Sequence, residues 1–250
     1  MPDTFRLDDV KTYLDPSAVL LTADHADAMP RLPAYWQPYL SPDHGTRMAH
    51  LKGELSELGA VLPKAAVATL EMTRDVFLVR YQDARHGPRI ARIYNQASWD
   101  DAEGEQLYSA ISRAPLPAEH LNSMERAFLD RAPPHLTRVY RELFDGFESI
   151  LGGGGLSHLG GLHTLAELGD AYGEQDWYAD FIAGHDPALV YEVYSNGGGV
   201  NILLDLNAPA RAKAEEPVGI LVDVKDRTFQ PDMEMWDLMD TMTSISVSGK

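Results

Sequence analysis

The chain has 250 residues, of which 44% are hydrophobic and 24% charged, a composition typical of a folded protein rather than a disordered one. It contains no cysteine, which excludes disulfides, thiolate catalysis and thiolate-bound zinc. The start of the chain is acidic, and no apolar run approaches the roughly 20 residues that span a bilayer, so we expect a cytoplasmic protein without a membrane segment.

The formal net charge is −17, and most of it lies in the second half. Residues 1–113 carry 12 basic and 16 acidic side chains, a net of −4, whereas residues 114–250 carry 9 and 22, a net of −13. Such a field repels nucleic acid and anionic lipid and attracts basic partners. The charge disfavours a protein that binds nucleic acid or a membrane, and it is compatible with a basic protein partner or with a purely solubilising role.

Residues 1–113 are predicted to form an N-terminal α/β extension or a small module. Within the proline-rich first 50 residues, "PRLPAYWQPYL" (residues 30–40) predicts an extended segment laid over a surface, and Arg47–Leu62 places leucines at helical spacing. The β-branched and aromatic runs Val76–Tyr81 and Arg89–Tyr94 predict a hairpin. Ser98 is a good helix N-cap with aspartates in the turn after it, so we expect a helix to begin there.

The stretch Ser112–Pro117 predicts the internal boundary, with a second domain over residues 114–250. Apolar residues lie on one face of two predicted helices, Glu119–Asp130 and His135–Phe144. Gly146 follows the second helix, where a residue with positive φ is common because glycine has no Cβ.

A second hairpin is the strongest short-range prediction in this half. The runs Ala188–Tyr194 and Val200–Leu206 flank Ser-Asn-Gly-Gly-Gly, and Asn-Gly favours a tight turn because both turn residues need positive φ. Short helical pieces, "LHTLAEL" and "DWYADFIA", are expected before it; a strand at Val218–Val224 and a helix over Met235–Met242 follow. The elements predict an α+β fold, a mostly antiparallel sheet flanked by helices.

The run Gly152–Gly155, with His158 and His163 after it, could in principle bind phosphate or a metal. A Walker loop needs a lysine directly after the glycines, and a dinucleotide fingerprint needs a strand before them; neither is present. The two histidines are five residues apart, not four as in HExxH, and the Gly-x-Ser-x-Gly spacing of serine hydrolases is missing around Ser157. The favoured interpretation is a bend that the glycines permit, with no catalytic residue, cofactor or metal.

Acidic and aromatic side chains alternate between residues 170 and 181. This mixture is common on protein-binding surfaces, where rings anchor the partner and charges steer it, although Trp177 and Phe181 could instead pack inward. The main candidates for partner binding are Tyr172, Glu174, Asp176, Trp177 and Asp180. Secondary candidates near strand ends are Asp205, Asp223 and Asp226.

The order of elements over residues 114–246 resembles the SUKH superfamily, which includes yeast cell-wall assembly regulators and many bacterial immunity proteins. The resemblance rests on "APPHLTRVYRELFDGF", the glycine-rich "LGGGGLSHLGGLHTL", the hairpin "VYEVYSNGGGVNILLDL", the strand "VGILVDV" and the closing helix "FQPDMEMWDLMDTM". It covers about half of the chain and implies a SUKH-like fold for that half.

The resemblance also implies a binding function. Bacterial members of this superfamily typically neutralise a cognate toxin, often a nuclease or another effector, by occluding its active site. The acidity agrees independently, because nuclease toxins carry basic grooves. We therefore expect a non-enzymatic immunity protein whose partner is a secreted toxin with a basic surface. The alternatives are a regulatory or scaffolding module and, less favoured, a metal-dependent hydrolase that uses His158 and His163.

Overall fold

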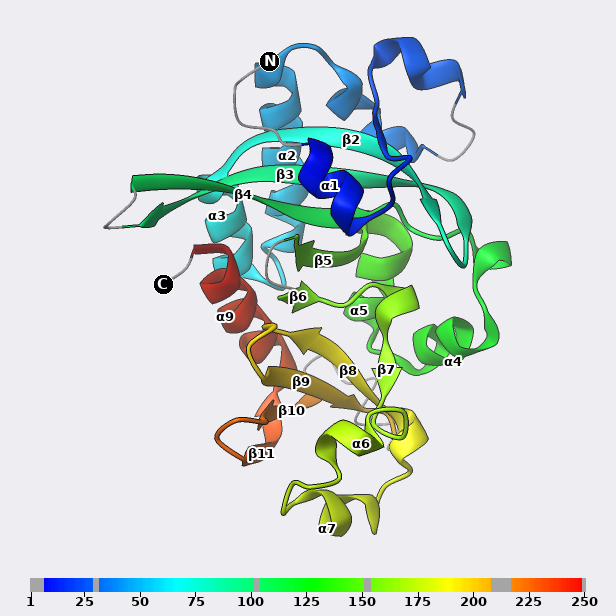
Figure 1. Cartoon of the computed structure of the whole chain (residues 1–250), viewed down its shortest axis with the longest axis vertical. Helices are drawn as coiled ribbons and strands as arrows, with labels where there is room; N and C mark the ends of the chain where they lie inside the picture. The colour runs from blue at the N-terminus through cyan, green and yellow to red at the C-terminus, as the bar shows by residue number, and fades with distance from the viewer. Residues whose placement is uncertain (1–6, 29–31, 101–103, 151–153, 208–216, 249–250) are drawn as a thin grey trace.

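The computed structural model describes all residues except 1–6, 29–31, 101–103, 151–153, 208–216 and 249–250. Within the described residues, eleven strands form one sheet in the order β1-β2-β3-β4-β5-β6-β8-β9-β10-β11, with β7 beside β8 (Figure 1). The strand pairs are antiparallel throughout. Helices flank this sheet, so the predicted α+β class is confirmed.

Residues 1–113 contribute the longest strands of the sheet. Their elements are α1 (Leu7–Tyr13), β1 (Val19–Leu20), η1 (Ala23–Ala28), η2 (Ala34–Leu40), α2 (His44–Leu58), α3 (Pro63–Met72), β2 (Thr73–Asp83), β3 (Gly87–Asp100) and β4 (Gly104–Arg113). The predicted helix over residues 47–62 is confirmed as α2, and the predicted first hairpin is confirmed as β2 and β3.

The helix predicted to begin at Ser98 is wrong. β3 continues through this residue to Asp100 and pairs with β4 along ten residue pairs, from Ala91 opposite Arg113 to Asp100 opposite Gly104. An N-cap signal is local, whereas a ladder of this length satisfies the backbone groups of both strands, so pairing overrides the capping preference.

The prediction of an extended surface segment over residues 30–40 is wrong for Ala34–Leu40, which form the 3₁₀ helix η2. Pro33 precedes the first turn of η2 and Pro38 lies inside it. The restricted φ of proline is compatible with a 3₁₀ turn. Trp36 and Tyr39 of η2 are buried, so this segment belongs to the hydrophobic core.

The second half begins with η3 and two helices, as the periodicity predicts, and then adds the remaining strands. Its elements are η3 (Ala118–His120), α4 (Ser123–Arg131), α5 (Pro134–Arg138), η4 (Val139–Leu143), β5 (Asp145–Ser149), β6 (Gly155–Leu156), η5 (Leu159–Gly161), β7 (His163–Thr164), α6 (Gly169–Tyr172), α7 (Tyr178–Ile182), η6 (Pro187–Leu189), β8 (Val190–Ser195), β9 (Val200–Asp205), β10 (Val218–Asp223), β11 (Thr228–Glu234) and α9 (Met235–Ser248).

The second predicted hairpin is confirmed as β8 and β9, and the later strand and closing helix as β10 and α9. The piece "LHTLAEL" is not helical, because His163 and Thr164 pair with Glu192 and Tyr191 of β8. The closing helix that the resemblance implies for "FQPDMEMWDLMDTM" is wrong for Phe229–Glu234, because these residues belong to strand β11, which pairs with β10.

The core lies on both faces of the sheet because side chains alternate along each strand. On one face, Leu78, Ile202 and Leu204 belong to the largest apolar cluster, which includes residues of α2, α3, α4 and α9. On the opposite face, α1 covers a smaller cluster around Val79, while α6 and α7 cover another around Leu203. Figure 1 shows α1 crossing in front of β2, β3 and β4, with α2 and α3 behind them.

The predicted boundary at Arg113 and Ala114 falls where β4 ends. β4 pairs with β5 from the second half, through Ala110 opposite Ser149 and Arg113 opposite Asp145. Helix α9 also packs against α3, next to which it lies in Figure 1. The two predicted halves therefore contribute to one sheet and share one core.

Candidate functional site

The candidate site is built around an irregularity in the last strand pair. Gly219 pairs with Met233 and Leu221 with Gln230, so two residues of β11, Pro231 and Asp232, lie opposite a single residue of β10. This is a β-bulge, which changes the direction of side chains and is common next to functional sites. Asp232 has a φ of 60°, a left-handed conformation that aspartate adopts more readily than most residues.

A cavity of ≈ 500 Å³ lies beside this bulge. Its lining joins three carboxylates, three aromatic rings, one histidine and three aliphatic or proline side chains: Asp180, Asp205, Asp232, Trp177, Phe181, Phe229, His185, Val218, Ile220 and Pro231. Two further cavities measure ≈ 20 and ≈ 10 Å³, room for little more than one water molecule. Among these three cavities, only the first could hold a ligand.

The rings of this cavity pack into an ordered cluster between α7 and β11. Trp177 stacks on Phe229 with ring centroids 4.5 Å apart and planes at 17°. Phe181 stacks on His185 at 4.1 Å and meets Phe229 edge-on at 5.4 Å. The indole N–H of Trp177 is buried and donates to no acceptor among the described residues, a rare condition for a buried donor.

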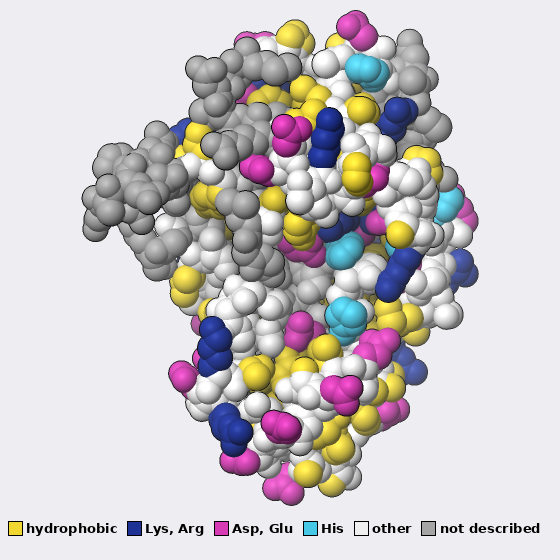
Figure 2. All heavy atoms as spheres, viewed as in Figure 1, with side chains coloured by type: hydrophobic (Ala, Val, Ile, Leu, Met, Phe, Trp, Pro, Cys, Tyr) yellow, Lys and Arg dark blue, Asp and Glu magenta, His cyan; other side chains and the backbone are white. Residues whose placement is uncertain are grey.

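The polar groups of the cavity give it a negative field. His185 Nε2 lies 3.3 Å from Asp205 Oδ2, and Asp205 Oδ1 accepts hydrogen bonds from the backbone and side chain of Asn207. Asp180, on α7, lines the cavity and is exposed to solvent. No lysine or arginine of the described chain lines the cavity. Figure 2 shows acidic and hydrophobic side chains gathered at the lower end of the molecule, where Figure 1 places α6 and α7.

Of the eight predicted binding residues, the structure brings three together in this cavity: Trp177, Asp180 and Asp205. Glu174 and Asp176 are exposed between α6 and α7. Asp223 and Asp226 lie at the turn between β10 and β11, where Asp223 Oδ1 accepts from the backbone amide of Asp226. Partner contact by any of these residues stays a prediction.

Among the eight predicted binding residues, Tyr172 is the one that the structure buries. Its ring is 1% exposed within the core, and its hydroxyl donates to Glu192 and accepts from Asn201. Burial, together with the charge of Glu192, raises the pKa of Tyr172 well above its usual range. The ring supports α6 on the sheet and is not available as an exposed anchor.

Sequence reasoning missed His185, Phe229 and Asp232 as cavity residues. His185 follows Phe181 by four residues, and this spacing could have indicated a shared face. Phe229 and Asp232 lie on a strand that was not predicted, and no short-range pattern indicated the bulge that brings Asp232 to the cavity.

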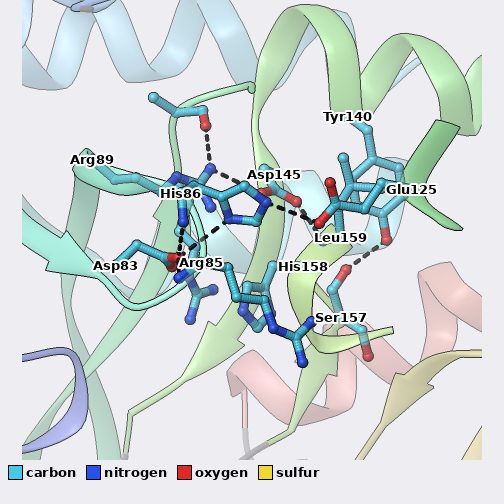
Figure 3. Close-up of polar contacts among 12 residues, drawn as sticks. Asp83, Arg85, His86, Arg89, Glu125, Tyr140, Asp145, Ser157, His158 and Leu159 are labelled. Carbon is cyan, nitrogen blue, oxygen red and sulfur yellow. Dashed lines mark hydrogen bonds and ion pairs between the residues drawn. The ribbon is translucent and has the colours of Figure 1, made fainter. Parts of the chain in front are cut away.

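The glycine-rich corner is held by polar contacts with other segments of the chain, part of which Figure 3 shows. Asp145 Oδ1 accepts from the backbone amide of Leu159 at 2.6 Å, and Arg89 donates to Asp145 Oδ2 at 2.9 Å. Glu148 binds His158 through its ring Nδ1 at 3.1 Å and accepts from Arg113 at 2.9 Å. Burial acts to raise the pKa of Glu148, but His158 and Arg113 outweigh it and hold that pKa well below its usual range.

A second part of the same network centres on a buried histidine. His86 Nδ1 lies 3.2 Å from Asp83 Oδ1, and its Nε2 lies 3.0 Å from Glu125 Oε1 (Figure 3). Arg85 donates to the carbonyl of Gly160 at 2.6 Å. These contacts join the turn between β2 and β3 to α4 and to the glycine corner. The network therefore holds together segments that are far apart in the sequence.

Glycines allow close backbone approach at this corner. Gly146 has a φ of 74°, as predicted, although it lies within β5, and a Cβ there would come within 2.7 Å of the His158 backbone. Gly155 has a φ of 138°, and its Cβ would lie 1.9 Å from the carbonyl oxygen of Phe147. Gly152 and Gly153 lie outside the described residues.

The two histidines of the glycine-rich stretch have separate partners. His158 pairs with Glu148, whereas the more exposed His163 lies 4.0 Å from Glu167. Within the described residues, no group of three or more histidine, aspartate or glutamate side chains is arranged to hold a metal ion. Over the same residues, none of the helices combines the length and the apolar character that a bilayer crossing requires.

Comparison with known proteins adds no relative. No protein-family model, curated protein or solved structure matches this chain. The resemblance of residues 114–246 to the SUKH superfamily therefore stays a prediction.

Proposed function

We propose that this chain is a binding protein that neutralises a basic partner, and that the partner is a cognate secreted toxin. The observation that carries the proposal is the cavity beside the β11 bulge, which combines Asp180, Asp205 and Asp232 with aromatic rings and no lining cation among the described residues. It belongs to the half of the chain with a net charge of −13.

The rate of association and the rate of dissociation depend on different features of a binding surface. An acidic surface raises the association rate with a basic protein, by about 10–10³-fold at low salt, because long-range attraction increases the encounter frequency. Desolvated aromatic side chains then slow dissociation. The cavity offers both features in one place, since Trp177 and Phe229 lie beside the carboxylates.

The arrangement of the cavity gives less support to catalysis. His185 and Asp205 form a pair that could serve as a base, but the described lining contains no serine, threonine, tyrosine or lysine that it could activate. The acidic groups of the glycine corner are engaged in ion pairs with Arg89, Arg113 and the histidines. The cysteine-free composition supports a cytoplasmic location for the proposed inhibitor.

The test is co-expression with the product of the neighbouring reading frame, followed by co-purification and stopped-flow association in salt from ~0.05 M to ~0.5 M. We expect a complex whose association rate falls about tenfold or more over this range while its dissociation rate changes less. A neighbouring toxin that does not bind, or association indifferent to salt, argues against the proposal. Capture of a regulatory enzyme instead favours the scaffolding alternative.

A further inference from the structure

The chemistry of the cavity beside the β11 bulge indicates which part of a partner it accepts. We propose that it binds the guanidinium group of one arginine side chain on the surface of a partner protein. The nature of the partner rests on the function proposed above, whereas the preference for a guanidinium group rests on the cavity alone.

The size of the cavity suits one side chain and the atoms next to it. Its ≈ 500 Å³ lies within the range of about 300–1,000 Å³ of small-molecule sites. The aliphatic lining of Val218 and Ile220 can contact the methylene stem of an arginine, which packs on apolar surface while its charged end stays polar.

The aromatic lining suits a planar cation. Trp177, Phe181 and Phe229 all border the cavity. A guanidinium group is attracted to the negative face of an aromatic ring and stacks on it, and it is more weakly hydrated than the ammonium group of lysine. These properties favour arginine over lysine as the occupant.

The same chain contains a filled example of such an arrangement. The guanidinium carbon of Arg92 lies 4.7 Å from the ring centroid of Trp36, 5.1 Å from that of Tyr39 and 4.9 Å from that of Tyr94. Its charge is paired with Glu54. Several aromatic rings and a carboxylate thus hold one buried guanidinium group within this fold.

The cavity also combines aromatic rings with carboxylates, and no lysine or arginine of the described chain is among its lining residues. The carboxylates come from three elements, Asp180 from α7, Asp232 from the bulge of β11 and Asp205 from the end of β9. Carboxylates bind guanidinium groups through paired, charge-assisted hydrogen bonds. Charge complementarity therefore selects a cation, and the rings select a flat one.

The experiment uses the full chain, labelled with ¹⁵N, and three blocked tripeptides: acetyl-Gly-Arg-Gly-amide and its counterparts with lysine and with citrulline, the neutral isostere of arginine. The indole cross-peak of Trp177, one of four tryptophans, is assigned with W177F and followed in each titration. We expect the arginine peptide to shift it with a Kd of roughly 1 mM, the lysine peptide to bind more weakly and the citrulline peptide not at all.

Two variants test the lining. D180N/D232N removes two charges, and asparagine tolerates the left-handed φ at position 232. F229L removes a ring face and keeps an apolar side chain. Each is expected to weaken binding of the arginine peptide by about tenfold, while E71Q/E119Q, at two exposed glutamates outside the lining, leaves it unchanged. If either cavity variant fails to fold, the citrulline comparison on the wild-type chain still decides the charge requirement.

Several results overturn the inference. One is an equal response to arginine and citrulline peptides; another is wild-type affinity in D180N/D232N. Tighter binding of free L-arginine than of the blocked peptide points to a small-molecule ligand. Arg211 and Lys213 lie between β9 and β10 in the sequence, outside the described residues. If the arginine peptide binds the R211A/K213A variant but not the wild-type chain, a basic side chain of this chain occupies the cavity and the inference is wrong.

The two proposals fail separately. If a toxin partner binds D180N/D232N as tightly as wild type and the arginine peptide does not bind, the cavity inference is wrong and the proposed function stands. If the arginine peptide binds selectively and no toxin partner is captured, the proposed function is wrong and the cavity inference stands.

Discussion

Asp240, in α9, accepts a hydrogen bond from the backbone amide of Ala65, in the first turn of α3, at 2.8 Å. Its other carboxylate oxygen accepts from the amide of Lys64 at 3.1 Å. Leu62, the N-cap residue of α3, has no side-chain acceptor for these amides. A carboxylate 175 residues away therefore caps α3, which joins the first and second halves of the chain.

The first prediction concerns this cap. Asp240→Ala should lower the free energy of unfolding by about 1–2 kcal/mol, because two helix-terminal amides lose their acceptor in a buried place. The matched control is Asp237→Ala on the same helix, since Asp237 is exposed and, among the described residues, its ion pair is with the ammonium group of Lys64. Its removal should change the unfolding free energy by less than about 1 kcal/mol. Urea denaturation measures both; equal effects would contradict the capping role.

The second prediction concerns the glycine corner. Gly155→Ala should be strongly destabilising, because its φ of 138° and the 1.9 Å approach of a Cβ to the Phe147 carbonyl oxygen oppose any side chain. Backbone strain and overpacking each contribute about 1–3 kcal/mol. Gly53→Ala is the control: a Cβ there meets nothing within 4 Å, and alanine should stabilise α2 by about 0.5–1 kcal/mol. The prediction is wrong if both variants unfold at the same urea concentration.

The third prediction concerns acid stability. The pKa of Glu148 is lowered in the folded protein, so its ion pairs stabilise the fold above its unfolded pKa of about 4.5, and this contribution is lost as the pH falls below that value. Glu148→Gln should lower the unfolding free energy at neutral pH and flatten its decline in acid. Urea denaturation across the acid range measures the slope.

Glu192, whose pKa is shifted in the opposite direction, provides a control for that experiment. Burial raises its pKa, so its effect on the unfolding free energy becomes less favourable as the pH rises through the acid range. Glu192→Gln keeps an acceptor for the Tyr172 hydroxyl and should steepen the rise of stability with pH. Slopes that change in the same direction for both variants would contradict this assignment.

The fourth prediction applies to the complex with the proposed partner. Trp177→Ala should raise the dissociation rate about tenfold or more, because truncating a central aromatic anchor removes contacts that act after encounter. D180N/D232N should mainly lower the association rate. Surface plasmon resonance separates the two rates. A cavity outside the interface would leave both rates of both variants at the wild-type values.

Elements with strong local periodicity were predictable from the sequence. The leucine spacing over residues 47–62 and the Asn-Gly turn after β8 each specify local structure, because few alternatives bury the same apolar side chains. Ser98 failed as a helix start because pairing between β3 and β4 decides the conformation there. Strand β11 exists because β10 presents an edge for it, and that edge is a property of the folded sheet.

The residues of the candidate site were also only partly predictable from the sequence. Composition alone indicated an acidic, aromatic binding region, and it pointed to Trp177, Asp180 and Asp205 because those residue types suit a basic partner. The same composition also pointed to Tyr172, whose ring folding places in the core. Phe229 and Asp232 join the cavity only because the bulge in β11 carries them beside α7. Residue types set the chemistry of the region, and long-range strand pairing, which no local pattern encodes, decides which side chains meet there.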